Sequence, residues 1–264
     1  MNLTDKVVWI TGASAGIGEA TAQLAAKKGA KLVLSARRLE ELERVKRSLN
    51  LPDNDVLVVP MDVEKPDDFP ALVENVIRHF GRIDVLYNNA GISQRGGVVE
   101  TDLAVYKRLM EVNFYGVVAL TKAVLPYMQA QKSGLIAATS SVSGKLGSAK
   151  RSGYSASKHA LHGFLDALRA EVAKDGLSIT LICPGYIRTE ISKNALSPDG
   201  TAHGKMDENQ AKGMPVEACA ARIIRAFEQE KPEVYMGGME VLGIYLKRFL
   251  PGLLRKILVN EAPK

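Results

Sequence analysis

The stretch Val7-Val8-Trp9-Ile10-Thr11-Gly12-Ala13-Ser14-Ala15-Gly16-Ile17-Gly18 decides the fold of this chain of 264 residues. Its first four residues form an apolar run typical of a buried strand, and residues 17–28 have the pattern of a helix. Between them, the glycines let the backbone turn tightly and approach a pyrophosphate, whose negative charge the free N–H groups of the helix start attract. Three residues separate Gly12 from Gly16, so the spacing differs from the common G-x-G-x-x-G fingerprint. The order of strand, turn and helix still indicates a nucleotide pocket.

Strand and helix patterns alternate along the whole chain. Such alternation predicts an α/β fold, a doubly wound parallel sheet with helices on both faces and a ligand crevice at the carboxyl ends of the strands. We expect seven strands, at residues 7–10, 31–35, 56–59, 85–87, 135–139, 178–182 and 234–236. The helices are expected at residues 17–28, 39–49, 68–80, 103–129, 154–174 and 216–229.

Length and composition favour a single domain over residues 1–264. A chain that is 46% hydrophobic and 24% charged can bury one substantial core. No secretory signal pattern opens the sequence, and no uninterrupted apolar run approaches the ~20 residues needed to cross a bilayer. Cys183 and Cys219 lack metal-ligand spacing and are expected to be buried thiols. We therefore expect a cytoplasmic protein.

The net charge of +6 does not predict a nucleic-acid partner. Basic residues are interspersed with acidic ones, as in residues 40–47, which is typical of a solvated helix face. No interleaving of aromatic and basic residues and no zinc spacing is present. His159 and His162 have no paired Cys, Asp or His at ligand spacing, so no metal site is expected.

Tyr154 and Lys158 are the clearest candidate catalytic pair. Positions i and i+4 share one helix face, so the phenol and the ammonium would point into the same site. A free tyrosine has a pKa near ~10 and exchanges protons poorly at neutral pH. A pKa lowered by ~2 to 3 units through Lys158 and a cationic nicotinamide ring would correspond to roughly 3 to 4 kcal/mol. The alternative is an ordinary amphipathic helix with Tyr and Lys at its edge.

Further motifs join this pair in a recognisable order. They are Thr11-Gly12-x-x-x-Gly16-x-Gly18, Asp62-Val63, Asn88-Asn89-Ala90-Gly91, Asn113, Ser141, Tyr154-x-x-x-Lys158 and Pro184-Gly185 followed by Thr189. With these pieces the sequence resembles the short-chain dehydrogenase/reductase family, and in its C-terminal third the member 7B-like proteins of that family. The resemblance implies a single Rossmann-type domain that transfers hydride between a nicotinamide cofactor and a small-molecule alcohol or carbonyl substrate.

The same resemblance implies a role for each matching residue. Tyr154 would be the acid/base, Lys158 its pKa modulator, and Ser141 the group that holds the substrate oxygen with Tyr154 by a hydrogen bond. Asn113 would break the local helix ladder and help hold a water that links Lys158 to solvent. The implied cofactor contacts are Gly12, Ser14, Gly16, Ile17, Gly18, Asp62, Val63, Asn89, Ala90, Gly91, Tyr154, Lys158, Pro184, Gly185, Ile187 and Thr189.

Charge after the second strand predicts which cofactor is used. Enzymes that prefer NAD commonly place a carboxylate there to bind the ribose 2′-hydroxyl. This chain has Ala36 followed by Arg37 and Arg38, which suit fork-like binding of a 2′-phosphate. We therefore expect NADP(H). The alternative is that the arginines only pair with Glu40 or Glu41.

Two segments bear on substrate and partners. Residues 186–214, rich in glycine and polar at the centre, are expected to form a substrate lid with Ile187, Ile191, Leu196 and Met206 as an apolar wall. A lid that only excludes water is the alternative. Residues 240–264 form a cationic amphipathic tail. Packing on its own domain or a twin subunit, in a homodimer or homotetramer, is favoured over contact with an acidic membrane surface.

The combined motifs predict an NADPH-dependent reductase of a carbonyl compound. A catalytically idle nucleotide-sensing or interaction protein on the same fold is the alternative from another class. Within the family, a 3-oxoacyl carrier-protein reductase would need a basic landing patch, to which Arg95 and Lys145 could contribute.

Overall fold

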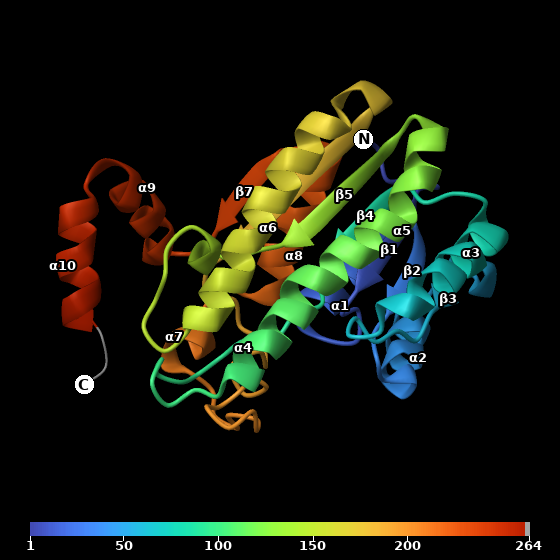
Figure 1. The fold of residues 1–264 in the computed structure, drawn as a ribbon. Coiled ribbons are helices and arrows are strands. Elements are labelled where there is room, and N and C mark those ends of the chain that lie inside the picture. Colours follow the sequence, from blue (N-terminus) through green and yellow to red (C-terminus); the bar gives the residue numbers. More distant parts are fainter. Residues whose placement is uncertain (262–264) are drawn as a thin grey trace.

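Seven parallel strands form one sheet in the computed structural model, which describes residues 1–261. The strand order is β3-β2-β1-β4-β5-β6-β7 (Figure 1). The chain thus starts in the middle, winds out to β3, and returns beside β1 to wind the other way, which confirms the predicted doubly wound fold. The strands are β1 Val7–Thr11, β2 Lys31–Ser35, β3 Val56–Val58, β4 Val85–Asn88, β5 Gly134–Thr139, β6 Leu177–Pro184 and β7 Glu233–Met236.

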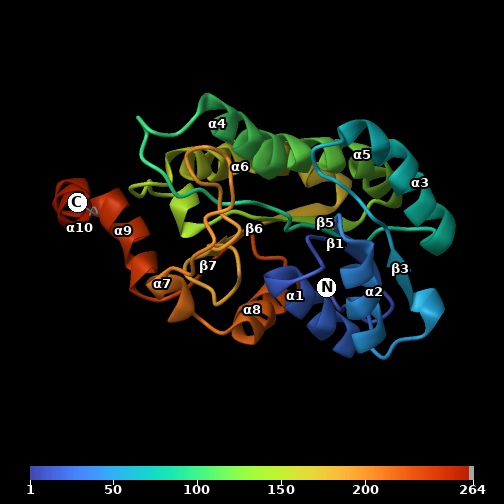
Figure 2. The same ribbon diagram turned by 90° about the horizontal axis from the view of Figure 1, so that it is seen from below.

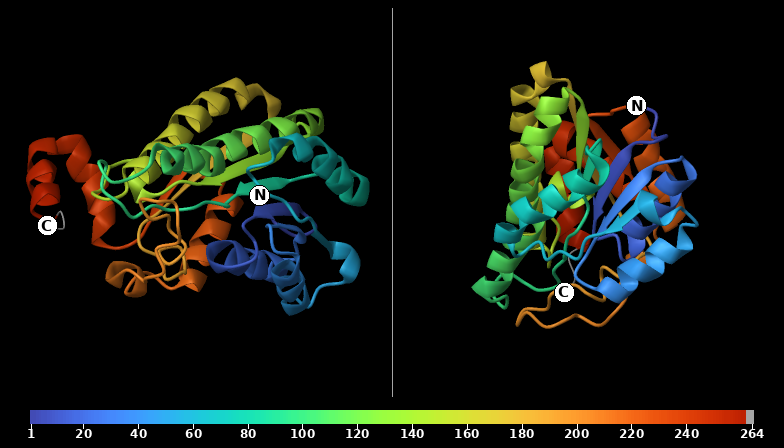
Figure 3. Two further views of the ribbon diagram at one scale, coloured as in Figure 1. Left: turned by 60° about the horizontal axis from the view of Figure 1, so that its bottom comes forward. Right: turned by 90° about the vertical axis from the view of Figure 1, so that its right-hand side faces the viewer.

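Helices cover both faces of the sheet. The α1, α2 and α8 helices lie on one face, and α3, α5 and α6 lie on the other (Figure 3). Strand β1 alternates accordingly: Val8 and Ile10 pack with the first layer, and Val7 and Trp9 with the second. The helices are α1 Gly16–Lys27, α2 Leu39–Ser48, α3 Phe69–Phe80, α4 Leu103–Met110, α5 Gly116–Gln131, α6 Ser152–Glu171, α7 Glu208–Ala211, α8 Val216–Glu228, α9 Leu242–Phe249 and α10 Pro251–Glu261.

The helix predicted over residues 103–129 is interrupted. A π-helical turn, Glu111–Tyr115, joins α4 to α5 and contains Asn113, which is fully buried. The expected break in the helix ladder is therefore present, and such π-turns recur at functional sites. By length and composition alone, Leu103–Gln131 is the one helical stretch among the described residues that could cross a membrane. Here it packs beside α3 and α6 over the sheet, as the core helix of a globular domain does.

The segment 186–214 folds over the carboxyl ends of the strands (Figure 2). A short bridge between Gln94 and Leu196 holds it there, and a second bridge, between Ile187 and Met214, joins the two ends of the segment to each other. The segment covers the crevice where the lid was predicted, and its role as a lid stays a prediction. Beyond β7, α9 and α10 project from the body of the domain (Figure 1). Residues 262–264 of the predicted tail lie outside the described part of the chain.

Candidate active site

The glycine-rich turn is fastened to the end of β4. Thr11 Oγ1 accepts hydrogen bonds from the backbone N–H groups of Asn89 and Ala90, both at 2.9 Å, and Asn89 Nδ2 donates to Thr11 O at 3.0 Å. Gly12 has a φ of +66°, and a Cβ there would lie 3.0 Å from Ala90 Cα, so the two strand ends approach too closely for a side chain. This is the switch point of the sheet, where doubly wound folds bind ligands.

The start of α1 offers donors to an anion. The helix begins at Gly16, and no side chain caps the N–H groups of its first turn. Those groups and the helix dipole favour a phosphate at this position. The turn therefore has the backbone geometry and the electrostatics that the pyrophosphate of a dinucleotide requires.

An elongated cleft runs along this turn as two adjoining cavities that share Gly12, Ala90 and Gly91. The first, of about 430 Å³, holds the candidate catalytic pair and is lined among others by Gly16, Ile17, Asn89, Tyr154, Lys158 and Thr189. The second, of about 490 Å³, is lined among others by Ser14, Arg37, Arg38, Asp62 and Val63. The cleft thus has the length and the donors to hold a nicotinamide dinucleotide, with its reactive end beside Tyr154.

Four predicted cofactor residues line neither cavity. Gly18 lies directly against the backbone of the glycine-rich turn, since a Cβ there would lie 2.2 Å from Gly12 O. Pro184 O accepts a hydrogen bond from Ser141 Oγ at 3.3 Å. Gly185 packs against the Glu240 side chain, and Ile187 is 2% exposed in the core. The contact of these four residues with a cofactor stays a prediction.

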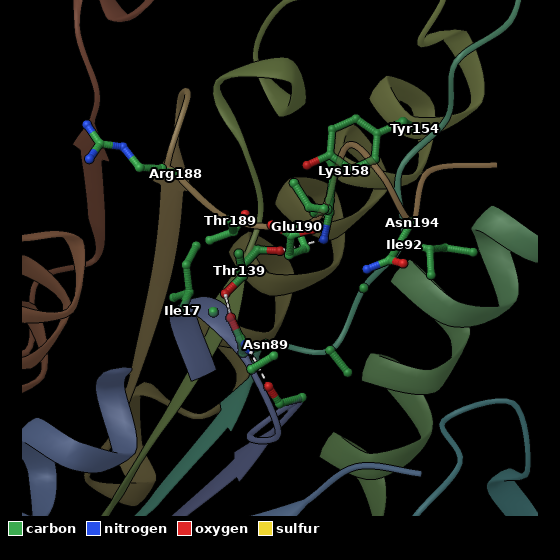
Figure 4. Close-up of a pocket in the computed structure, with 16 residues that line it drawn as sticks. Ile17, Asn89, Ile92, Thr139, Tyr154, Lys158, Arg188, Thr189, Glu190 and Asn194 are labelled. Carbon is green, nitrogen blue, oxygen red and sulfur yellow. Dashed lines mark hydrogen bonds between the residues drawn. The ribbon is translucent and has the colours of Figure 1, made fainter. Parts of the chain in front are cut away.

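Tyr154 sits in a small apolar cluster with Val105, Leu109 and Leu196, and its ring lies beside Lys158 at the cleft (Figure 4). Gln94 fixes the beginning of α6, because its Oε1 accepts from Gly153 N at 2.8 Å and Tyr154 N at 3.3 Å. The phenol is therefore held in one place by packing and by the anchored helix start.

Burial raises the pKa of Tyr154, and the side-chain hydrogen bond between Tyr154 and Ser141 is the largest effect in the opposite direction. The guanidinium groups of Arg151 and Arg95 also lower this pKa. Lys158 Nζ lies 5.9 Å from the centre of the tyrosine ring and donates to Thr139 O at 2.7 Å. Burial lowers the pKa of Lys158 to about 8. The protein's own groups thus leave the phenol protonated, which suits a proton donor, and a lowered pKa requires further positive charge beside it.

Asn113 connects the helix layer to the cleft. Its Oδ1 accepts from Ile92 N at 2.9 Å, and its Nδ2 donates to Ile92 O at 2.9 Å and to Ser157 Oγ at 3.0 Å. A Cβ on Gly91 would lie 3.0 Å from Asn113 Oδ1 and 3.3 Å from Lys158 Nζ. The geometry therefore brings Asn113, Gly91 and Lys158 together, and the water relay stays a prediction.

Two arginines beside Tyr154 were not assigned to the catalytic site from the sequence. Arg151 Nη2 lies 3.0 Å from Asp207 Oδ2, and Arg95 Nε donates to the same oxygen at 2.8 Å. The pair binds residues 186–214 to the body of the domain and adds a net positive charge near the phenol. Arg151 is the N-cap residue of α6, three residues before Tyr154, and this short separation in sequence could have indicated the contact.

The basic groups considered for an acyl carrier protein are engaged elsewhere. Arg95 is paired with Asp207, and Lys145 Nζ lies 2.9 Å from Glu233 Oε1. Neither cation is therefore available as an open landing patch. By contrast, Arg37 and Arg38 are exposed and form no ion pair within residues 1–261, so the pairing with Glu40 or Glu41 is not observed.

Arg44 is a further residue that the sequence did not single out. It was placed on a solvated helix face, but its Nη2 donates to Ser14 O at 3.2 Å and to Glu19 Oε2 at 2.9 Å. It therefore braces the outside of the glycine-rich turn. No local spacing signals this contact, because it joins residues 30 positions apart.

A buried polar cluster supports the Ser141 segment from behind. Ser140 Oγ donates to Lys158 O at 3.2 Å, so His162 Nε2, 2.9 Å away, donates to Ser140. The fold also brings ligand atoms of His162, Cys183 and Glu233 within 4.8 Å of one another, a grouping that the sequence spacing did not predict. The ammonium of Lys145 already supplies the positive charge at this carboxylate.

Acidification is expected to destabilise the fold through His162. Burial lowers its pKa to about 4 from the ordinary histidine value of 6.5, so between these pH values the unfolded chain binds a proton that the native one does not. Its contribution to stability is present above pH 6.5 and is lost as the pH falls towards 4. In His162→Gln, the slope of unfolding free energy against pH should fall by about 1.4 kcal/mol per pH unit across this window.

Urea unfolding at several pH values measures that slope. An identical slope in the wild type and in His162→Gln would show that His162 does not titrate in the way its burial implies.

A Rossmann-type domain with Tyr, Lys and Ser beside a dinucleotide cleft defines an oxidoreductase. The family model described as short chain dehydrogenase matches residues 6–199. The chain therefore belongs to the short-chain dehydrogenase/reductase family, which confirms the resemblance found in the sequence.

Curated relatives and solved structures agree with this assignment. The chain is 42% identical to the Drosophila melanogaster dehydrogenase/reductase SDR family protein 7-like, over 99% of this chain and 82% of that protein. It is 40% identical to the Bos taurus family member 7B, over 98% of this chain and 82% of that protein.

Among solved structures, a Burkholderia phymatum family member in complex with NAD has a TM-score of 0.84 at 24% identity, covering 100% of this chain and 98% of that chain. An alcohol dehydrogenase from the archaeon Thermococcus sibiricus, complexed with 5-hydroxy-NADP, has a TM-score of 0.75 at 26% identity, covering 89% and 97% respectively. Structures of this fold thus carry either type of nicotinamide dinucleotide.

Proposed function

We propose that this protein is an NADP(H)-dependent oxidoreductase that interconverts a small carbonyl compound and its alcohol, working mainly as a reductase. The observation that carries the proposal is that Tyr154 and Lys158 line one end of the dinucleotide cleft, with Ser141 hydrogen-bonded to Tyr154. A proton donor beside a cradle for a hydride donor is the arrangement that carbonyl reduction requires.

In the proposed reaction, the bound nicotinamide supplies the hydride. Ser141 donates a hydrogen bond to the substrate oxygen, and Tyr154 transfers its proton to that oxygen as negative charge develops there. Lys158, largely protonated at neutral pH, stabilises the phenolate that remains. Asn113 is proposed to hold the water through which Lys158 exchanges protons with solvent. Residues 186–214 are proposed to close over the substrate and keep bulk water out.

The proposed preference for NADP(H) rests on Arg37 and Arg38. Both are exposed at the far end of the cleft, where Ala36 replaces the carboxylate that would repel a 2′-phosphate. The reductive direction rests on the excess of NADPH over NADP that cells usually hold.

Replacing Arg37 with Ala is expected to lower kcat/KM for NADPH by about 10- to 100-fold and to leave the value for NADH almost unchanged, because one charge-assisted contact is lost. Steady-state kinetics with both cofactors measures the ratio. Arg47→Ala, which removes an exposed arginine from the opposite end of α2, is the control. An unchanged cofactor preference in Arg37→Ala would remove this residue from the role.

The function itself is tested by following NADPH oxidation across a panel of ketones and aldehydes. Turnover of at least one compound, with the alcohol recovered as product, supports a reductase. Tight NADPH binding without turnover of any carbonyl would instead favour a nucleotide-sensing protein. A cytoplasmic homodimer or homotetramer is proposed from the family alone, and no nucleic-acid partner is proposed.

A further inference from the structure

The two helices after β7 expose an unusual share of the molecule's apolar surface. We call residues 242–259 the C-terminal hairpin; it comprises α9 and most of α10, joined at Pro251. Twelve large apolar side chains are exposed in the described part of the chain, and six of them belong to this hairpin. They are Leu242, Tyr245, Phe249, Leu250, Leu253 and Val259. Apolar side chains gathered in this way mark an interaction surface.

The base of the hairpin is attached to the domain, and its tip is not. The ring of Tyr245 lies 6.3 Å from that of Tyr235 in β7, and Lys247 Nζ donates to Lys145 O. Leu254 is only 7% exposed and lies close to Gly243 of α9, so the two helices hold each other. At the tip, by contrast, Phe249 is 74% exposed, and the hairpin extends from the body in Figure 1 and in the left view of Figure 3.

The charge on the hairpin has one sign. Between residues 241 and 260 the sequence holds Lys247, Arg248, Arg255 and Lys256 and no acidic residue. All four cations are exposed, and they flank the apolar tip on both of its sides. Apolar side chains beside basic ones complement an anionic bilayer, into whose headgroup region the apolar groups enter while the cations bind phosphate.

We propose that the C-terminal hairpin docks the protein onto an anionic lipid surface, with Phe249, Leu250 and Leu253 entering the headgroup region. A second copy of the chain fits this face less well. A two-fold interface brings the same surface of both subunits together, so four cations would meet four cations without an acidic residue of the hairpin between them. The sequence pattern favoured packing of the tail on its own domain or on a twin subunit. The exposure of its apolar side chains in the structure now favours a lipid surface instead.

Flotation with vesicles tests the proposal on the full chain. The wild type should float with vesicles of equal parts phosphatidylcholine and phosphatidylserine, and should stay behind with phosphatidylcholine alone. Phe249→Ser/Leu253→Ser should lower the partition coefficient by about tenfold or more, because two apolar side chains no longer enter the bilayer. The matched control, Leu39→Ser/Leu103→Ser, removes two equally exposed leucines elsewhere and should bind as the wild type does.

Charge is tested separately by Arg248→Glu/Arg255→Glu, which should abolish most of the binding. Its control is Arg47→Glu/Arg222→Glu, which changes the net charge equally at two exposed positions outside the hairpin. Equal loss in both charge variants would mean general attraction of a basic protein and would overturn the proposal.

Sedimentation without lipid tests whether a second copy of the chain, and not a lipid surface, binds the C-terminal hairpin. If the wild type is an oligomer and Phe249→Ser/Leu253→Ser is a monomer that unfolds at the same temperature, the hairpin is a subunit interface and the lipid proposal is wrong. An unchanged oligomeric state together with lost vesicle binding supports it. Neither readout depends on turnover, so the proposal can fail while the proposed function stands.

Discussion

Replacing Tyr154 with Phe is expected to lower kcat by about 10²- to 10⁴-fold, the range that general acid–base catalysis contributes. The change removes the phenolic oxygen that gives the proton and leaves the ring. Since the ring packs among Val105, Leu109 and Leu196, the variant should fold and melt as the wild type does. All other implied cofactor contacts remain, including Lys158 and the glycine-rich turn, so the affinity for NADPH should change little. Single-turnover NADPH oxidation, with cofactor binding followed by fluorescence, measures both quantities.

Tyr235→Phe is the matched control, since it removes a tyrosine hydroxyl in β7 outside the cleft. We expect it to keep wild-type kcat. If Tyr154→Phe retained most of its activity, another group would have to donate the proton, and the assignment of the site would be wrong. A loss of NADPH binding in this variant would mean that the phenol acts in binding instead.

The alternation of the sequence was sufficient to predict the sheet. All seven strands and the six longest covering helices lie where apolar runs and amphipathic periodicity placed them, because a parallel sheet covered by helices on both faces buries both faces of its inner strands. The chemical motifs were equally local: the glycine-rich turn and the pair Tyr154 and Lys158 each lie within one element and its flank. Parallel strands then bring their carboxyl ends to one edge, so the meeting of these motifs followed from the topology.

What the sequence did not predict depends on contacts between distant segments. Asp207 joins Arg95 and Arg151, which precede it by 112 and 56 positions, and no spacing rule reports such contacts. The pKa of Tyr154 is another case, because it reflects how completely the folded chain excludes water from the phenol. The exposure of the C-terminal hairpin is a third, since an amphipathic pattern indicates an apolar face without indicating what covers it.

Gly18 should tolerate a methyl group least of all the glycines in the nucleotide turn. Its φ is not positive, so the constraint is space: a Cβ would lie 2.2 Å from Gly12 O and 2.7 Å from Asn89 Nδ2. The first contact is a backbone carbonyl that cannot swing away, and the second is the amide that fastens the turn to β4. Gly18→Ala must therefore push the turn outward and weaken the bond between Asn89 and Thr11.

We expect Gly18→Ala to lower the free energy of unfolding by about 1 to 3 kcal/mol, as overpacking does. The dissociation constant for NADPH should rise by about a hundredfold, because the N–H groups of α1 move relative to the pyrophosphate. Urea unfolding and cofactor titration measure the two effects.

Gly163→Ala is the control: this glycine lies inside α6 with no atom within 4 Å of its added Cβ. It should raise stability by up to about 1 kcal/mol and leave NADPH binding alone. If both variants had the same free energy of unfolding and the same dissociation constant for NADPH, the turn would have room for a side chain at Gly18. The absence of a side chain there would then not be required for cofactor binding.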